Sequence, residues 1–179
     1  MQQKQYMERF IMQDLIAWKN REDRKPLILL GARQVGKTYI LKEFGQREFE
    51  NVAYINCDNN AMAKDLFASD YNIDRILLTI GAITGVNIEA GKTLIIMDEI
   101  QELHRGLASL KYFCENAREY HVAVAGSLLG LSLHQGESYP VGKVNTLEMY
   151  PMTFEEFLWA RGFKPVSYTH LTLPTSDLV

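Results

Sequence analysis

The hydrophobic positions of the chain fall into short apolar runs separated by segments with helical spacing. Five runs are rich in aliphatic residues, and four of these five are apolar throughout instead of alternating with polar positions. Continuous apolar runs of this length are typical of strands that are covered on both faces. We therefore predict strands at 27–31, 52–57, 93–98, 121–126 and 144–149.

The segments around these runs repeat their apolar residues at helical intervals. Before the first strand, Met7, Ile11, Leu15 and Trp18 follow such a spacing and predict an amphipathic helix over 4–19. Further helices are predicted at 38–44, 61–68, 73–83, 107–118 and 154–161. The alternation of strands and helices predicts an α/β fold with a three-layer parallel sheet of five strands.

Two signals set the boundaries of predicted helices. Gly45 follows the helix over 38–44 and is expected to end it, because glycine is a poor helix former. Thr153 precedes the last predicted helix, and Glu156 stands three residues later, which is the spacing of a capping box. This last helix is expected to begin directly after Thr153.

The composition is that of an ordinary globular protein and excludes several classes. The chain has 179 residues, of which 47% are hydrophobic and 23% charged, with a formal net charge of -3. This balance argues against a surface built to neutralise nucleic-acid phosphates, so nucleic acid is not indicated as a partner. No stretch has the roughly 18 apolar residues of a membrane span, and the start lacks the apolar core of a signal peptide. We expect a cytoplasmic protein with no membrane partner.

The segment from Gly31 to Thr38, GARQVGKT, fits the phosphate-binding pattern G-x-x-x-x-G-K-[ST]. It follows a predicted strand and opens a predicted helix, which is the context that this pattern requires. Backbone N–H groups at a helix N-terminus bind anions, and glycines allow the close approach of a phosphate. The alternative is an ordinary glycine-containing turn.

Within this segment, Lys37 would supply a positive charge for the β and γ phosphates of a bound triphosphate. The hydroxyl of Thr38 would supply an oxygen ligand for Mg²⁺. The residues predicted to bind the nucleotide are Gly31, Ala32, Arg33, Gln34, Val35, Gly36, Lys37, Thr38 and Tyr39.

An acidic pair ends another apolar run, TLIIMDEI. Asp98 could hold Mg²⁺ together with Thr38, and Glu99 could orient and deprotonate an attacking water. Acidic residues also end strands in solvated turns, so the pair alone is a weak signal. Combined with the phosphate-binding pattern, it predicts hydrolysis of a bound triphosphate, with Lys37 and Glu99 in catalytic roles.

Two further polar residues are weaker candidates. Ser127, in AVAGSLLG, follows a strand expected between the two motifs and could sense the γ-phosphate, although a helix-capping serine explains it equally well. Lys143 precedes the last predicted strand and could point at a phosphate held by a neighbouring subunit. A solvated lysine is the simpler interpretation of Lys143. A homo-oligomer therefore stays an open alternative.

Four blocks of the sequence resemble the prokaryotic AAA+ ATPases: LLGARQVGKTYIL, LIIMDEIQELHRGLASLKYF, AVAGSLLG and VGKVNTLEMYPMTFEEFL. The resemblance implies a five-stranded P-loop NTPase sheet of AAA+ type. Walker A would be Gly31 to Thr38, Walker B would be Asp98 and Glu99, and Ser127 would be a sensor. Gln101 matches the DEIQ form of the family, whereas Lys143 stands where related ATPases often carry an arginine.

The resemblance also implies a helical lid and a separate C-terminal domain, which we expect to be missing here. An unknown protein partner would then bind through that missing domain. We divide the chain into an N-terminal helix and linker at 1–25, an ATPase core at 26–165 and a tail at 166–179. The tail lacks Lys, Arg and Glu, and 166–175 resembles a translated transposase sequencing adapter. We expect the tail to be non-native and this truncated chain to hydrolyse ATP weakly.

Two functions fit these motifs. The first is Mg²⁺-dependent ATP hydrolysis that drives a conformational switch, and the second is an ATP-binding interaction module with negligible turnover. Glu99 favours the first function. The acidic pair disfavours a kinase of a small metabolite. The resemblance to the AAA+ ATPases, together with the lack of an N-K-x-D motif, implies that the chain is not a GTPase.

Overall fold

The computed structural model describes residues 8–58, 60–67, 69–127 and 139–163. Within them, five parallel strands form one sheet in the order β2-β3-β4-β1-β5. The strands are β1 (Leu27–Gly31), β2 (Asn51–Asn56), β3 (Thr93–Asp98), β4 (His121–Ser127) and β5 (Asn145–Glu148). The predicted parallel α/β sheet of five strands is confirmed.

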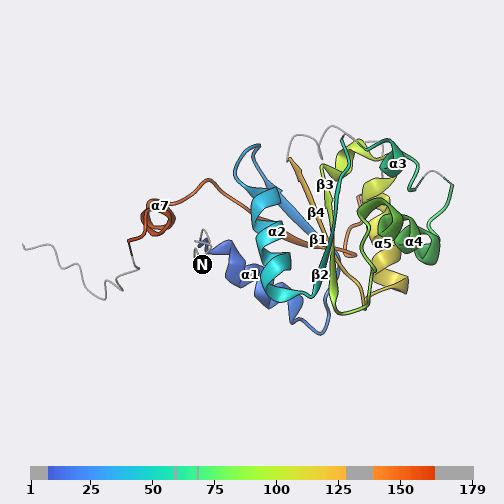
Figure 1. Cartoon of the computed structure of the whole chain (residues 1–179), viewed down its shortest axis with the longest axis horizontal. Helices are drawn as coiled ribbons and strands as arrows, with labels where there is room; N and C mark the ends of the chain where they lie inside the picture. Colours follow the sequence, from blue (N-terminus) through green and yellow to red (C-terminus); the bar gives the residue numbers. More distant parts are fainter. Residues whose placement is uncertain (1–7, 59, 68, 128–138, 164–179) are drawn as a thin grey trace, which may run out of the picture.

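Helices cover both faces of this sheet, as Figure 1 shows. On one face lie α1 (Ile11–Lys19) and α2 (Lys37–Glu48), and on the other lie α3 (Ala61–Lys64), α4 (Ile73–Thr84) and α5 (Gly106–Asn116). Successive strand residues point to opposite faces, so Ile28 belongs to the core under α4 and α5, whereas Leu27 and Leu29 belong to the core under α1 and α2. The predicted three layers are therefore present.

The parallel arrangement brings the ends of β1, β3 and β4 to one edge of the sheet. Strand β4 lies between the other two, with Ser127 beside Gly31 and Ala125 beside Asp98. The segment that follows β1 and the acidic end of β3 are thus separated by a single strand.

Helix α2 continues through Gly45 to Glu48, so the prediction that Gly45 ends the helix was wrong. A Cβ atom built on Gly45 would lie 2.6 Å from a methyl carbon of Val52 in β2. Glycine therefore allows α2 to approach the sheet closely. This packing overrides the low helix propensity of glycine.

Helices α1 and α3 differ from their predicted bounds by several residues, whereas α5 and α7 differ by one or two. Helix α1 begins at Ile11, and residues 8–10 before it are not helical. The N–H of Phe10 instead donates to Glu156 Oε1 at 2.9 Å. Residues 1–7 lie outside the described part of the chain. Helix α3 ends at Lys64, and the turn that follows brings Leu66 and Phe67 into the core.

The last described helix, α7 (Phe154–Ala160), begins with the predicted capping box. Thr153 Oγ1 accepts from the N–H of Glu156 at 3.2 Å, and Glu156 Oε2 accepts from the N–H of Thr153 at 2.8 Å. The rings of Phe10 and Trp159 meet edge to face with centroids 4.8 Å apart, so α7 lies beside the start of α1. The tail at 166–179 lies outside the described residues.

None of the helices in the described segments combines the length and the apolar character needed to cross a bilayer.

Candidate functional site

The loop between β1 and α2 has a glycine at each end, Gly31 and Gly36, and its backbone conformation requires both. A Cβ atom on Gly31 would lie 2.4 Å from the carbonyl oxygen of Met149, so no side chain fits there. Gly36 has a φ of 98°, in the left-handed region that favours glycine. The loop therefore turns sharply and presents the N-terminus of α2 at the carboxyl edge of the sheet, where backbone N–H groups can bind an anion.

Lys37 holds this loop from inside. Its Nζ donates to the carbonyl oxygens of Gly31 at 2.9 Å and Ala32 at 2.8 Å, and the residue is 7% exposed. Burial lowers the pKa of Lys37, while the negative charges of Glu99 and Asp98 oppose that shift. The carboxylates across the pocket thus help to keep the ammonium group charged.

Thr38 and Asp98 connect the loop to the end of β3. Thr38 Oγ1 donates to Asp98 Oδ2 at 2.5 Å, and the hydroxyl of Tyr54 donates to the same oxygen at 3.2 Å. Burial, together with the charge of Asp98, raises the pKa of Tyr54 to about 12, so the phenol is a neutral donor at pH 7. A hydroxyl oxygen and a carboxylate oxygen that meet at one point are the donor types that Mg²⁺ prefers. The two predicted metal ligands therefore fit this ion.

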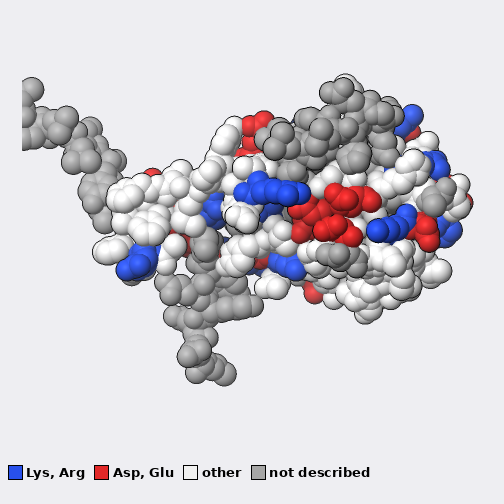
Figure 2. Space-filling view, turned by 90° about the horizontal axis from the view of Figure 1, so that it is seen from above, with Lys and Arg blue, Asp and Glu red and all other residues white. Residues whose placement is uncertain are grey.

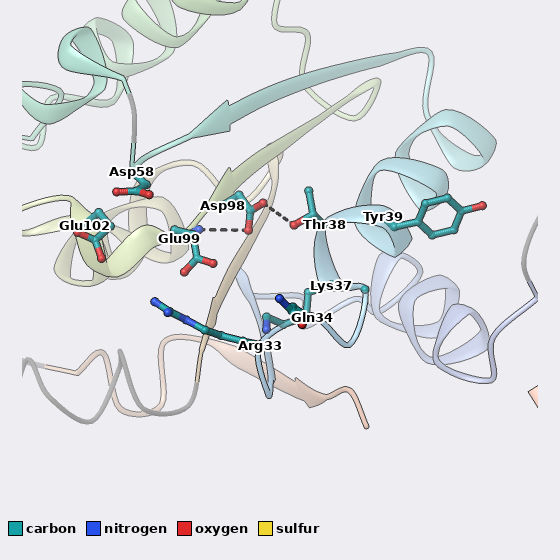
Figure 3. Close-up of a pocket in the computed structure, with 10 residues that line it drawn as sticks. Arg33, Gln34, Lys37, Thr38, Tyr39, Asp58, Asp98, Glu99 and Glu102 are labelled. Carbon is teal, nitrogen blue, oxygen red and sulfur yellow. Dashed lines mark hydrogen bonds between the residues drawn. The ribbon is translucent and has the colours of Figure 1, made fainter. Parts of the chain in front are cut away.

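Glu99 follows Asp98 at a sharp backbone turn. Its φ of 51° and ψ of 48° lie in the left-handed region, which is uncommon for a residue with a side chain. This turn starts the 3₁₀ helix η1 (Ile100–Glu102) and ends the strand. Figure 3 shows the Glu99 carboxylate directed toward the loop, on the side of Lys37 and Arg33.

These side chains line one pocket of about 550 Å³. The loop and α2 contribute Arg33, Gln34, Gly36, Lys37, Thr38 and Tyr39. The segments after β2 and at the end of β3 contribute Asp58, Asp98 and Glu99, and η1 contributes Glu102. Figure 2 shows carboxylates gathered beside basic side chains on the face of the molecule seen from above. A pocket with cations on one wall and carboxylates on the other can hold a phosphate chain together with a divalent cation. In Figure 3 the side chain of Tyr39 points away from the other labelled residues.

Five predicted residues are not part of the described pocket lining: Gly31, Ala32, Val35, Ser127 and Lys143. The first three belong to the loop itself, whereas Ser127 and Lys143 come from other parts of the chain. The backbone of Ser127 ends β4 beside Gly31, but its side chain lies outside the described structure, and its sensing role stays a prediction. Lys143 precedes β5 at the opposite, amino edge of the sheet, where its Nζ lies 2.8 Å from Glu115 Oε1. The structure thus does not bring Lys143 to this pocket, and its role toward a neighbouring subunit also stays a prediction.

Asp58 and Glu102 line the pocket although the sequence analysis did not single them out. Asp58 lies just after β2, so the reasoning that selected Asp98 at the end of a strand could have found it. Glu102 is brought to the pocket by the turn of η1, which has no periodic signal in the sequence.

Cys57, which precedes Asp58, is buried. Burial and the negative charges of Asp98 and Glu99 raise the pKa of its thiol to about 12. Cys57 is therefore a neutral core thiol.

Arg9 contacts the loop from the segment that precedes α1. Its Nη1 donates to the carbonyl of Val35 at 3.3 Å, and its Nη2 donates to the carbonyl of Tyr150 at 2.8 Å. The residue is 7% exposed. The guanidinium group therefore fixes the loop relative to the segment that follows β5, which the sequence pattern did not indicate.

The chain matches known proteins over most of its length. Residues 23–158 match a family model described as an AAA domain. An uncharacterized protein of Methanocaldococcus jannaschii is 31% identical over an alignment of 145 residues, and the match covers 76% of this chain and 28% of that protein. The chain thus spans 28% of the length of this relative.

Two solved structures are similar in outline. The Aeropyrum pernix ORC1 protein, solved in complex with DNA, aligns with a TM-score of 0.48 and 14% identity over 85% of this chain and 47% of its own. A variant of Thermotoga maritima RuvB aligns with a TM-score of 0.47 and 19% identity over 83% of this chain and 45% of its own.

Proposed function

The chain belongs to the AAA domain family, and from that premise we propose that it binds ATP with Mg²⁺ and hydrolyses it to drive a conformational switch. The observation that carries the proposal is the contact of Thr38 with Asp98 at 2.5 Å. This contact unites the helix that opens at the phosphate-binding loop with the strand that ends in the acidic pair.

The phosphates are proposed to bind at the loop. Backbone N–H groups at the start of α2 would donate to the phosphate oxygens, and the positive end of the helix dipole would favour their charge. Lys37 would exchange its contacts with the carbonyls of Gly31 and Ala32 for the β and γ phosphates. The exposed guanidinium of Arg33 lines the same pocket and would add a second positive charge.

Thr38 and Asp98 would hold Mg²⁺, which neutralises charge on the phosphates when it is bound. Glu99 would accept a hydrogen bond from the attacking water and take its proton as the water adds to the γ-phosphate. The half-buried Glu99 carboxylate lines the pocket on the side that faces the loop, as this role requires. As the water oxygen bonds to the γ-phosphorus, the bond from this phosphorus to the oxygen bridging it to the β-phosphate would break, and ADP would leave. Glu99 would then release its proton to solvent. Water is the acceptor, so no further substrate is needed.

Steady-state ATP turnover of the complete gene product and of its Glu99→Gln variant tests this function. We expect the variant to bind ATP as tightly as the unchanged protein and to hydrolyse it slower by roughly 10²-fold or more. Glu119→Gln, at an exposed position away from the pocket, is the matched control and should keep full turnover. Equal rates for the unchanged protein and Glu99→Gln would instead support an ATP-binding interaction module with negligible turnover.

A further inference from the structure

Gln101 is a buried amide that contacts the proposed base from the protein interior. It is 7% exposed and lies in η1, and its Nε2 donates to Glu99 Oε2 at 2.5 Å. No other side chain in the described segments donates a hydrogen bond to this carboxylate. One of the two carboxylate oxygens of Glu99 is thus held, and the other is available on the pocket side.

The surroundings of Gln101 do not favour a glutamine for core packing. Its Oε1 is buried and has no hydrogen-bond partner among the described residues. An unsatisfied buried acceptor of this kind destabilises the folded state, because it has lost its hydrogen bonds to water and gained none in the protein. The neighbouring Ile100 and Leu103 are apolar core residues, so an apolar side chain of the same length would fill this space without that cost. Core packing alone does not account for a glutamine here.

The backbone explains why Glu99 needs a second group to hold its side chain. Glu99 stands in a left-handed turn at the end of β3 and is half-buried at the pocket wall. A glutamate side chain with one end in an open pocket has several rotamers, and each of these places the carboxylate differently. A general base contributes fully only when its oxygen is held within hydrogen-bond reach of the water.

We infer that Gln101 is a positioning residue that fixes the Glu99 carboxylate so that its second oxygen meets the attacking water. The inference rests on the proposed ATPase function and deepens it. Gln101 itself touches neither the nucleotide nor the water, and its whole effect on turnover passes through Glu99. Its removal should therefore change the rate of the chemical step and leave nucleotide binding unchanged.

The test uses Gln101→Met, which keeps the length of the side chain and removes the donor. Turnover, KM, ATP affinity and the melting temperature are measured for the complete gene product, first alone and then in the Glu99→Gln background. We expect kcat to fall roughly tenfold, with KM and affinity changed by less than about twofold and the melting temperature not lowered, since the variant also removes the unsatisfied Oε1. In single-turnover assays of the Glu99→Gln background, the same substitution should have no further effect.

Three results would overturn the inference. The first is an unchanged kcat in Gln101→Met together with a reduced kcat in Glu99→Gln. This result would reject the role of Gln101 and would still support the proposed ATPase function. The second is an equal loss in both backgrounds, since Gln101 would then act independently of Glu99. The third is loss of folded protein in both Gln101→Met and Gln101→Leu, which would assign Gln101 to the core. Glu99→Gln turnover equal to that of the unchanged protein would instead reject the ATPase function itself.

Discussion

Arg9 and Glu156 form a buried ion pair, with Arg9 Nε 3.0 Å from Glu156 Oε1 and side chains that are 6% and 4% exposed. The Nε atom has no hydrogen-bond partner among the described residues, so this contact is an electrostatic one. Burial raises the pKa of Glu156, but hydrogen bonds from the N–H groups of Thr153 and Phe10 and the charge of Arg9 outweigh burial and lower it. One ionised carboxylate thus joins the start of α1 to the cap of α7.

The first prediction concerns this pair. Arg9→Met should lower the free energy of unfolding by about 3 kcal/mol, because Glu156 would keep a buried charge without its partner. Urea denaturation measures this change. Adding Glu156→Gln removes the uncompensated charge and should recover part of the loss. Purely additive effects of the two substitutions would show that the pair is not energetically coupled.

The second prediction concerns the phosphate-binding loop. Lys37→Ala should weaken ATP binding roughly 10- to 100-fold, because charge-assisted hydrogen bonds to the phosphates are lost. Isothermal titration calorimetry measures the affinity, and circular dichroism should show an intact fold. Lys92→Ala, which removes a surface lysine paired with Glu89, is the control and should bind normally. Unchanged affinity in Lys37→Ala would exclude this loop as the nucleotide site.

The third prediction concerns the metal. Asp98→Asn should reduce the difference between ATP affinities measured with and without Mg²⁺, because the variant lacks the carboxylate charge that attracts the ion. Tyr54→Phe is a close control, since it removes a hydrogen bond to the same oxygen and keeps the carboxylate. The control should retain its Mg²⁺ dependence. If Asp98→Asn also retains it, the ion is held by other groups.

The fourth prediction concerns acid stability. His121 is 6% exposed and packs edge to face against Trp18 and Phe49. Burial, with the positive charge of Arg24 adding to it, lowers the pKa of His121 from 6.5 to about 4. The unfolded chain therefore binds a proton at a higher pH than the folded one. The free energy of unfolding is therefore unaffected by this histidine above pH 6.5, and it decreases as the pH falls from 6.5 toward 4.

Urea denaturation at several pH values measures this loss, which is on the order of 3 kcal/mol for a shift of this size. His121→Phe should keep the aromatic packing and flatten the pH dependence between 6.5 and about 4. The same pH dependence in both proteins would assign the acid sensitivity to other groups.

Features that depend on local pattern were predictable from the sequence. Strands β1 and β3 have the predicted bounds, because a continuous apolar run between polar segments defines a central strand at both ends. The loop from Gly31 to Thr38 and the capping box at Thr153 were recognised from residue spacing alone. In each of these cases the residues that determine the structure are close neighbours in the chain.

Features that depend on distant contacts were not predictable. Gly45 resembles a helix end in the sequence, and only the approach of Val52 shows why the helix continues through it. Arg9 lies far in the sequence from the carbonyls of Val35 and Tyr150, and no local pattern indicates these contacts. The contact of Tyr54 with Asp98 likewise depends on the pairing of β2 with β3.

The strand order also bears on how the protein is made. Among the described strands, β1 pairs with β4 and β5, and both follow it in the chain. While the nascent chain leaves the ribosome, β2 and β3 can pair with each other, but β1 has no neighbour until His121–Ser127 has emerged. Such long-range pairing is slow, and an unpaired apolar strand is a template for aggregation. The loop from Gly31 to Thr38 is thus synthesised early, but β4, the strand that lies beside β1 at this loop, is the fourth of the five strands to emerge. Strand β1 stays unpaired during that interval.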